Sequence, residues 1–313
     1  MKRFFRLILL CLCCCAGAAA RETVPLADPF ILLHGDTYYA YGTRSMQGIE
    51  FFTSKDLKTW KSGGLALHKD DVFGEKWFWA PEVYKVGERF LMFYSGDTHI
   101  CAAWADSPRG PFKQTEQKPM MKERSIDHTL LIEEDGTPRI FCERFKDGTS
   151  YIWNAVLTPD LNTVKVDTFH YCIGPDQPWE LKHQRIVEGS AVLKHNGKYY
   201  LTYSGNGYPT PYYGIGCAVA DRPEGPWVKY EDNPIFQLPG DLKGVGHHAF
   251  FKDKEGKLRV VFHAHFSDKA VHPRQMYITT AEFKGDKLTI SPDYLIPMLE
   301  RDKNQPGSPA EKK

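Results

Sequence analysis

Short runs of aromatic and aliphatic residues, each introduced by a turn glycine, recur five times along the chain. They follow Gly35, Gly87, Gly136, Gly197 and Gly256, at intervals of 52, 49, 61 and 59 residues. A glycine beside a polar residue between two apolar runs is typical of a tight hairpin between β-strands. No helical periodicity of useful length occurs anywhere. Each repeat is therefore predicted to contain several strands.

A second turn follows the hairpin in the first four repeats. Repeats two and four share Asp-x-Pro-x-Gly-Pro and an aromatic residue, at 106–112 and 221–227, while repeats one and three have Asp-Leu at 56–57 and 160–161. Repeats of about 40–60 residues with several strands each are typical of propeller blades. We predict an all-β fold, a five-bladed β-propeller. The alternative is a large sandwich whose hairpins resemble one another by chance.

The first 20 residues have a different pattern from the rest of the chain. Basic residues near the start precede an apolar run at 7–15 and small residues at 16–20. This order is typical of a secretory signal peptide, and the run is shorter than the ~20 residues of a transmembrane helix. We predict a signal peptide at 1–20 and export to the periplasm, the medium or the cell surface. Cysteines within the apolar run leave a lipid anchor open, although the residues before them are not small.

The remaining chain is predicted to form one catalytic propeller domain at 21–300, followed by a polar, flexible tail at 301–313. No other apolar run is long enough to span a bilayer, so we predict no transmembrane segment. Four cysteines follow the signal, and their spacing does not match a zinc site: Cys101, Cys142, Cys172 and Cys217. Small core residues and one or two disulfides both remain open for them.

Composition narrows the class of partner. The 40 basic and 39 acidic residues leave a net charge of +1, which argues against a nucleic-acid partner because such proteins carry a basic surplus. Aromatic residues make up 13% of the chain, enough apolar surface to exclude extended disorder. A neutral polymer rich in rings that aromatic side chains can stack on, an oligo- or polysaccharide, fits this composition.

One polar residue lies upstream of the turn glycine in every repeat. Asp28 lies seven residues before its glycine, Glu82 five, and Asp127, Glu188 and His247 nine each. Because the first strand of each blade lines the channel, we expect these positions to be equivalent and to converge at one mouth. Converging carboxylates repel one another and gain nothing for stability. Their presence favours acid/base hydrolysis, such as glycoside hydrolysis by inversion with carboxyls ~6.5–9.5 Å apart.

The motifs around these residues resemble glycoside hydrolase family 43. They are Ala-Asp-Pro-Phe at 27–30, Trp-Ala-Pro-Glu-Val at 79–83, Ser-Ile-Asp at 125–127, Glu-Gly-Ser at 188–190 and Gly-Val-Gly-His at 244–247. The resemblance extends over about residues 25–300, and the order of one motif per blade makes it specific. It implies an inverting five-bladed propeller enzyme that acts on arabinose- or xylose-containing polysaccharides.

The resemblance also implies roles for individual residues. Asp28 would be the general base, Glu188 the general acid, and Asp127 the group that tunes and orients the acid. His247 would lie beside a structural calcium ion or a water molecule in the channel, and no cofactor is required for the chemistry. Arg274, in a Pro-Arg-Gln-Met-Tyr segment, resembles an arginine directed at the active site.

Aromatic residues near these motifs are predicted to stack on sugar rings. The run 77–79 precedes Glu82, and we expect a sugar contact at Trp77 or Phe78 and another at Tyr208, in a loop that also contains tyrosines at 212 and 213. Glu82 itself would either hydrogen-bond the substrate or form a structural salt bridge.

Alternatives remain open at several positions. Asp28, Asp127 and Glu188 could form local turns, and Arg274 could pair with a surface carboxylate. Histidines at 263 and 265 alternate on a strand, as packed side chains or as a metal pair. The functional alternatives are a carbohydrate-binding propeller without catalysis, a hydrolase of galactosides, and a retaining hydrolase of the fructan type.

Overall fold

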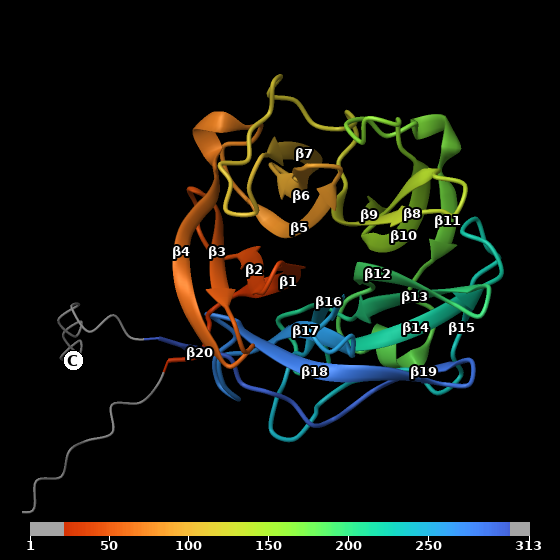
Figure 1. Cartoon of the computed structure of the whole chain (residues 1–313). Coiled ribbons are helices and arrows are strands. Elements are labelled where there is room, and N and C mark those ends of the chain that lie inside the picture. Colours follow the sequence, from red (N-terminus) through yellow and green to blue (C-terminus); the bar gives the residue numbers. More distant parts are fainter. Residues whose placement is uncertain (1–21, 301–313) are drawn as a thin grey trace, which may run out of the picture.

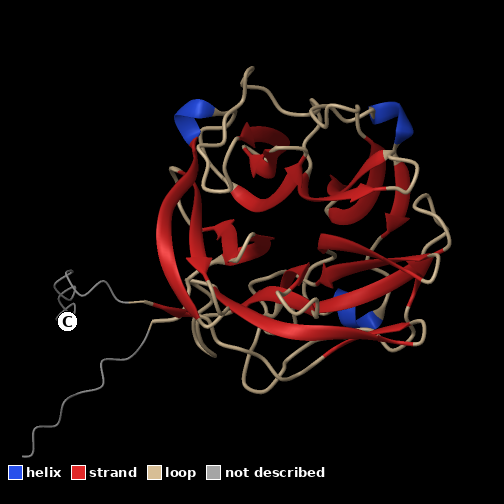
Figure 2. Ribbon diagram, in the orientation of Figure 1, coloured by secondary structure: helices blue, strands red, loops and turns tan. Residues whose placement is uncertain are grey.

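The computed structural model describes residues 22–300 and consists of five β-sheets arranged around a central axis (Figures 1 and 2). The five-bladed β-propeller predicted from the repeats is confirmed. The predicted signal peptide at 1–20 and the predicted tail at 301–313 lie outside the described residues. Three short 3-10 helices connect strands: η1 (Lys69–Asp71), η2 (Val166–Thr168) and η3 (Pro178–Leu181). None of the helices in the described range has the length and apolar character needed to cross a membrane.

The blades follow one another along the chain. Blade one contains β1 (Ala27–His34), β2 (Thr37–Thr43), β3 (Gly48–Ser54), β4 (Thr59–His68) and, from the other end of the chain, β20 (Met298–Leu299). Blade two contains β5 (Trp79–Val86), β6 (Arg89–Gly96) and β7 (His99–Ala105). Blade three contains β8 (Ile126–Ile132), β9 (Pro138–Lys146), β10 (Thr149–Val156) and β11 (His170–Ile173). Blade four contains β12 (Val187–His195), β13 (Lys198–Gly205), β14 (Gly214–Ala220) and β15 (Val228–Lys229). Blade five contains β16 (Gly246–Lys252), β17 (Leu258–Ala264), β18 (Gln275–Lys284) and β19 (Lys287–Ile290).

The core lies between blades, which explains the continuous apolar runs in the sequence. Each sheet has a neighbour on both faces, so successive residues of an inner strand are buried whichever way they point. Five hydrophobic clusters fill the interfaces; in one of them Tyr41 of β2 lies with Met92 of β6. The cysteines at 101, 142, 172 and 217 are all buried and free, so within the part of the chain that the structure describes they are core residues and form no disulfide.

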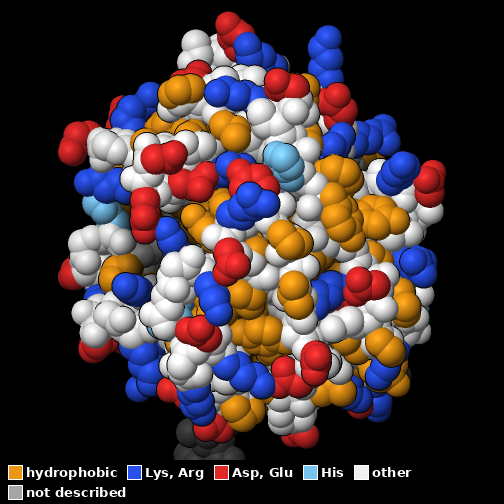
Figure 3. All heavy atoms as spheres, turned by 90° about the vertical axis from the view of Figure 1, so that its right-hand side faces the viewer, with side chains coloured by type: hydrophobic (Ala, Val, Ile, Leu, Met, Phe, Trp, Pro, Cys, Tyr) orange, Lys and Arg blue, Asp and Glu red, His pale blue; other side chains and the backbone are white. Residues whose placement is uncertain are grey.

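The outer wall carries charges of both signs. Figure 3 shows the side of the ring that includes β11 and β15, where basic and acidic side chains are interspersed among apolar ones. This mixing agrees with the near-zero net charge of the chain.

The ring closes by bringing the two ends of the described chain together. β20 adds to blade one in parallel beside β4, and Leu299 donates a backbone hydrogen bond to the carbonyl of Glu22 over 2.7 Å. Blade one therefore combines residues from both ends of the chain (Figure 1).

The first strand of every blade contains a bulge, and these bulges define the equivalent positions. The register shifts at the start of β1, β5, β8, β12 and β16. Within each shift one residue has a positive φ: Asp28 (49°), Ala80 (46°), Asp127 (52°), Gly189 (53°) and His247 (42°). For a residue with a Cβ this conformation costs about 1–2 kcal/mol. Bulges re-aim side chains beside active sites, where such strain is found.

The expected equivalence of all five polar positions was wrong. Glu188 precedes the bulge residue of its blade by one position, and Glu82 follows Ala80 by two. Counting back from the turn glycine failed for Glu188 because the hairpin loops differ in length, whereas the turns of blades one and two are equally long and the position equivalent to Asp28 is Ala80. Two residues join β12 to β13, whereas five residues (133–137) join β8 to β9. A shift of one residue in a strand turns a side chain to the opposite face.

Candidate active site

A pocket of about 670 Å³ opens at the end of the channel where these bulges lie. Six of the nine residues that the sequence assigned to the site line it, and three do not. The six are Asp28, Asp127, Glu188, Tyr208, His247 and Arg274. The motif order therefore identified residues from four different blades that meet in one cavity.

Asp28 is surrounded by basic groups. The Arg274 guanidinium binds both carboxylate oxygens, with Nη1–Oδ1 at 2.7 Å and Nη2–Oδ2 at 3.3 Å. Nδ1 of His263 and Nδ1 of His247 lie 3.3 Å and 3.4 Å from Oδ1. Burial alone would raise the pKa of Asp28, but Arg274 and the two histidines outweigh it and hold that pKa well below its usual value. Asp28 is therefore ionised over the whole neutral range.

Glu188 and Asp127 have the opposite electrostatics. Burial, followed by the charge of Asp127, raises the pKa of Glu188 to about 8. Burial, followed by the charge of Asp28, raises the pKa of Asp127 to about 7. The Tyr213 hydroxyl donates a hydrogen bond of 2.7 Å to Oε1 of Glu188 and fixes its orientation. The pocket thus combines a carboxylate that stays ionised with a carboxyl that keeps its proton at pH 7.

Glycines make room for this arrangement. A Cβ at Gly246 would lie 2.3 Å from the Tyr213 ring, so only glycine lets that ring reach Glu188. A Cβ at Gly189, the bulge residue of blade four, would lie 3.0 Å from the His247 ring. The bulge that carries an aspartate in blades one and three therefore carries glycine in blade four, where the neighbouring blade's histidine fills the space.

His247 lies between two carboxylates, with Nδ1 3.4 Å from Oδ1 of Asp28 and 3.6 Å from Oδ2 of Asp127. Calcium takes six to eight oxygen ligands. The side chains around this imidazole offer two carboxylates, and Arg274 already binds both oxygens of Asp28. The calcium ion or water expected here stays a prediction, and we derive no step through a metal.

The two strand histidines are packed side chains. His263 is fully buried and its ring stacks on Tyr213 at 5.7 Å, while Nδ1 accepts the backbone N–H of Asp28 at 3.2 Å. His265 is 8% exposed and its Nε2 forms a 2.7 Å hydrogen bond with the carbonyl of Tyr208. Each ring hydrogen-bonds to the backbone of a pocket residue. Of the two alternatives for these histidines, the packed side chain is therefore the one observed.

Tyr208 and Arg274 form one wall of the pocket. The guanidinium lies 4.3 Å from the centre of the Tyr208 ring, so Arg274 is held between an aromatic face and the Asp28 carboxylate. The alternative pairing of Arg274 with a surface carboxylate does not occur.

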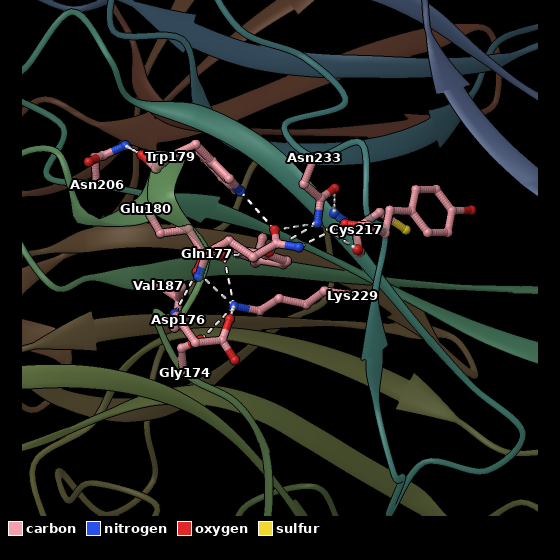
Figure 4. A network of polar contacts seen from close by, with 12 residues as sticks. Gly174, Asp176, Gln177, Trp179, Glu180, Val187, Asn206, Cys217, Lys229 and Asn233 are labelled. Atoms are coloured by element: carbon pink, nitrogen blue, oxygen red, sulfur yellow. Dashed lines mark hydrogen bonds and ion pairs between the residues drawn. The ribbon is translucent and has the colours of Figure 1, made fainter.

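The loop that carries Tyr208 and Tyr213 is anchored by a buried polar network (Figure 4). At its centre Glu180 is fully buried, and both of its oxygens lie 2.8 Å from Nζ of Lys229. The adjoining Trp179 carbonyl accepts a hydrogen bond from Asn206, which also donates to the carbonyl of Tyr212 over 3.0 Å. Asn206 thereby fixes the start of the loop against the connection between blades three and four.

Neither of the two residues predicted to contact sugar in the run 77–79, Trp77 and Phe78, lines the pocket. Trp79 lines the pocket, and the Trp77 ring stacks on it at 5.6 Å with 27° between the planes. Trp77 is 39% exposed and extends this aromatic surface outward, without lining the pocket itself. Phe78 points the other way, is 1% exposed and belongs to the core between blades one and two. Its ring has no surface to offer a sugar.

Glu82 is not part of the pocket wall. It is 7% exposed and accepts a hydrogen bond from the Tyr84 hydroxyl, and burial raises its pKa to about 8. Neither of the two roles expected for Glu82 is seen, because its side chain reaches no pocket surface and no basic group pairs with it among the described residues. It is a satisfied core carboxyl.

Two residues of the site carried no usable signal in the sequence. Tyr213 was one of several loop aromatics, and nothing local indicates that it contacts Glu188. Glu143, on the second strand of blade three, presents a carboxylate oxygen within 4.8 Å of oxygens from Asp127 and Glu188. Only the packing of blades three and four brings it there.

Comparison with known proteins gives consistent results. The model of the family described as glycosyl hydrolases family 43 matches residues 23–288. The structure of an endo-1,4-β-xylanase from Bacteroides thetaiotaomicron VPI-5482 is 42% identical, covers 90% of this chain and 100% of that chain, and has a TM-score of 0.87. A β-D-galactofuranosidase of Aspergillus niger is 26% identical over 271 residues, 77% of this chain and 74% of the relative. An extracellular exo-α-(1->5)-L-arabinofuranosidase of Streptomyces chartreusis is 25% identical over 279 residues, 76% of this chain and 79% of the relative.

Proposed function

The chain belongs to glycosyl hydrolases family 43 and is an O-glycosyl hydrolase, and from that premise we propose that it cleaves arabinofuranosyl or xylosyl linkages in plant polysaccharides or oligosaccharides with inversion of configuration. The similarity to proteins named as a xylanase and as an arabinofuranosidase supports this substrate class. One observation carries the catalytic assignment. Two carboxyl groups line the same pocket, and their pKa values are displaced in opposite directions.

Asp28 is the proposed general base. An inverting enzyme needs an ionised carboxylate that accepts a proton from the attacking water. The bidentate contact with Arg274 and the neighbouring imidazoles support ionisation of Asp28 at every working pH. Its place at a strained bulge, with φ at 49°, aims the carboxylate into the pocket.

Glu188 is the proposed general acid. The leaving oxygen needs a proton in the transition state, and a pKa of about 8 keeps Glu188 protonated at neutral pH. The negative charge of nearby Asp127 is the second largest cause of the raised pKa of Glu188, after burial. Environment alone separates the roles of the two carboxyls.

The reaction is a single displacement. Asp28 removes a proton from water, and the water oxygen forms a bond to the anomeric carbon while the glycosidic C–O bond breaks. Glu188 transfers its proton to the departing oxygen. Trp79 and Tyr208 supply aromatic surface for the sugar rings at the pocket wall.

The proposal is tested with wild type, Asp28→Asn and Glu188→Gln on arabinan, xylan and the 4-nitrophenyl arabinofuranoside, xyloside and galactoside. We expect both variants to lose about 10²–10⁴-fold in kcat on the polysaccharide. With the 4-nitrophenolate leaving group Glu188→Gln should lose much less, because this oxygen departs without a proton, while Asp28→Asn stays inactive. Product anomers followed by NMR establish inversion. Wild-type rates in both variants, or a retained anomer, would contradict the proposal.

A galactofuranoside is the second candidate substrate. The match to a β-D-galactofuranosidase over 77% of this chain favours it. The catalytic roles would be unchanged, so only the substrate panel separates the two. A 4-nitrophenyl galactofuranoside hydrolysed faster than both pentosides would select this candidate.

We also propose that the protein is exported. Relatives named as extracellular support this, and the leader predicted at 1–20 would direct it. Sequencing the amino terminus of the protein recovered outside the cytoplasm tests the proposal. An intact first residue on protein confined to the cytoplasm would contradict it.

A further inference from the structure

A fourth carboxyl lies behind the proposed acid. Glu143 is on β9, opposite Ile126 of β8, and is 6% exposed. Oxygens of Asp127, Glu143 and Glu188 all lie within 4.8 Å of one another. The mechanism described above uses the first and the last of these residues and leaves Glu143 without a role.

The hydrogen bonding of the Glu143 carboxyl group is incomplete. Its Oε2 is buried and has no hydrogen-bond partner among residues 22–300. Leaving a buried polar atom unpaired costs about 1–3 kcal/mol, and more when the group is charged. An ionised Glu143 would be an acceptor facing the acceptors of Asp127 and Glu188. A protonated Glu143 has a hydrogen to donate, and both neighbours can accept it.

We propose that Glu143 is a positioning residue: it keeps its proton and donates a hydrogen bond to the carboxylate that Glu188 becomes after protonating the leaving oxygen. This inference rests on the proposed function, since it assigns a partner to the acid of that reaction. The proton of Glu143 is not transferred, so the stoichiometry of the hydrolysis is unchanged. The effect is to lower the energy of the transition state in which negative charge develops on Glu188.

The charged surroundings agree with this assignment. Burial, followed by the charges of Glu188 and Asp127, raises the pKa of Glu143 well above its usual value. The other ionisable groups that face this cluster are His247, Tyr213 and Asp28 around Glu188, and Asp28, Arg274 and His247 around Asp127. None of them lies among the groups that shift Glu143. A cation in the cluster would instead hold Glu188 ionised and remove the acid that the hydrolysis needs.

Two variants of Glu143 separate a donor from the other possibilities. Glu143→Gln keeps a hydrogen-bond donor without a charge, and Glu143→Leu has similar bulk but no donor. The measurement is the pH dependence of kcat on an unactivated oligosaccharide. We expect Glu143→Leu to lose about tenfold or more in kcat, the worth of a hydrogen bond to a charged group. Its alkaline limb should move to higher pH, because the ionised form of Glu188 has lost a donor. Glu143→Gln should stay within about threefold of wild type.

Three results would overturn the inference. A limb that moves to lower pH in Glu143→Gln would mean that Glu143 is ionised in wild type, since the substitution then removes a repelling charge. Loss of wild-type activity with a chelator, restored by a divalent ion and abolished in Glu143→Gln, would mean a cation site. Lower melting temperatures in both variants with unmoved limbs would mean a purely structural role.

An infrared experiment keeps this inference distinct from the proposed function. The carbonyl band of a protonated carboxyl should be present in wild type at pH 7 and lose intensity in Glu143→Gln, whatever the substrate is. An unchanged band overturns the assignment even if hydrolysis proceeds as proposed. A loss of band intensity in Glu143→Gln, together with full activity in Glu188→Gln, would overturn the proposed acid and leave the protonation of Glu143 standing. Because the infrared test needs only Glu143→Gln, it also holds if Glu143→Leu fails to fold.

Discussion

Two glutamates of this propeller, Glu82 and Glu188, have the same acidity in very different places. Burial raises the pKa of each to about 8. Each accepts a hydrogen bond from a tyrosine hydroxyl, Tyr84 for the first and Tyr213 for the second. Only Glu188 lines the pocket. A raised pKa therefore does not identify a catalytic acid unless a substrate can reach the proton.

The position relative to the bulge accounts for the difference. Glu188 comes one residue before the bulge residue of its strand, and Glu82 comes two residues after Ala80. Successive side chains of a strand point to opposite faces of the sheet, and a bulge shifts this alternation by one residue. One glutamate consequently points into the cavity, and the other packs against the next blade, beside Thr129 and Leu130.

The largest expected difference between the two glutamates is in catalysis. Glu188→Gln should lower kcat on arabinan or xylan by about 10³-fold, because general acid catalysis is lost. Glu82→Gln, the matched substitution, should stay within about threefold of wild type because Glu82 does not reach the pocket. Steady-state kinetics of both variants beside wild type make the measurement. Equal losses of kcat in the two variants would contradict the distinction between an acid in the pocket and a buried core carboxyl.

The second expectation concerns stability, which Glu82 tests without the loss of catalysis that accompanies a change at Glu188. Its folded pKa of about 8 exceeds the usual value of 4.5, so its contribution to stability is complete below about pH 4.5 and is lost as the pH rises toward 8. Wild type should lose about 3 kcal/mol from this group between pH 5 and 7.5. Glu82→Gln, which cannot ionise, should lack that part of the loss. Urea unfolding at the two pH values measures it, and a pH dependence identical to wild type would exclude the raised pKa.

A third expectation concerns the pH profile of the wild-type enzyme. With Asp28 ionised throughout, kcat should stay flat through neutral pH and fall by about tenfold per unit above pH 8, as Glu188 loses its proton. The Glu82→Gln profile should have the same alkaline limb. A limb displaced in that variant would show that Glu82 is coupled to the reaction.

The smallest effect is expected from the two tyrosines. Tyr213→Phe removes a hydrogen bond that lowers the pKa of Glu188, so the alkaline limb should move up by roughly half a unit and kcat should fall a few-fold. Tyr84→Phe removes the same bond from Glu82 and should leave the limb in place while changing the melting temperature. If Tyr84→Phe moved the alkaline limb and Tyr213→Phe left it in place, our assignment of Tyr213 as the functional tyrosine would be wrong.

The sequence predicted the features that local chemistry determines. The turn glycines and the apolar runs specify hairpins without reference to the rest of the chain, so the five blades were predictable. Asp28, Asp127 and Glu188 were found because each lies in a short motif, and the motifs occur in blade order. The register of blade two was not predictable, because it depends on a bulge whose position no residue type reveals.

The residues behind the pocket that contact or approach Glu188 could not be predicted from the sequence, for a different reason. Glu143 is on a second strand and Tyr213 is in a loop, and both reach Glu188 only when blades three, four and five pack together. Phe78 was assigned to the pocket because aromatic residues look alike in sequence, whether they stack on a sugar or fill the core. Which of them faces the cavity is decided by tertiary packing.

The contact between Leu299 and Glu22 has a consequence for the order of the chain. Because the ring ends where it starts, no blade is structurally the first one. A short linker between residues 22 and 300, with new ends at the exposed hairpin of Gly87 and Glu88, would give a circular permutant with every strand pairing of the ring retained except that turn. Asp28 and Glu188 would then exchange their order along the polypeptide while keeping their places in space. The sequence order of the proposed catalytic groups is thus a property of where the ring is cut.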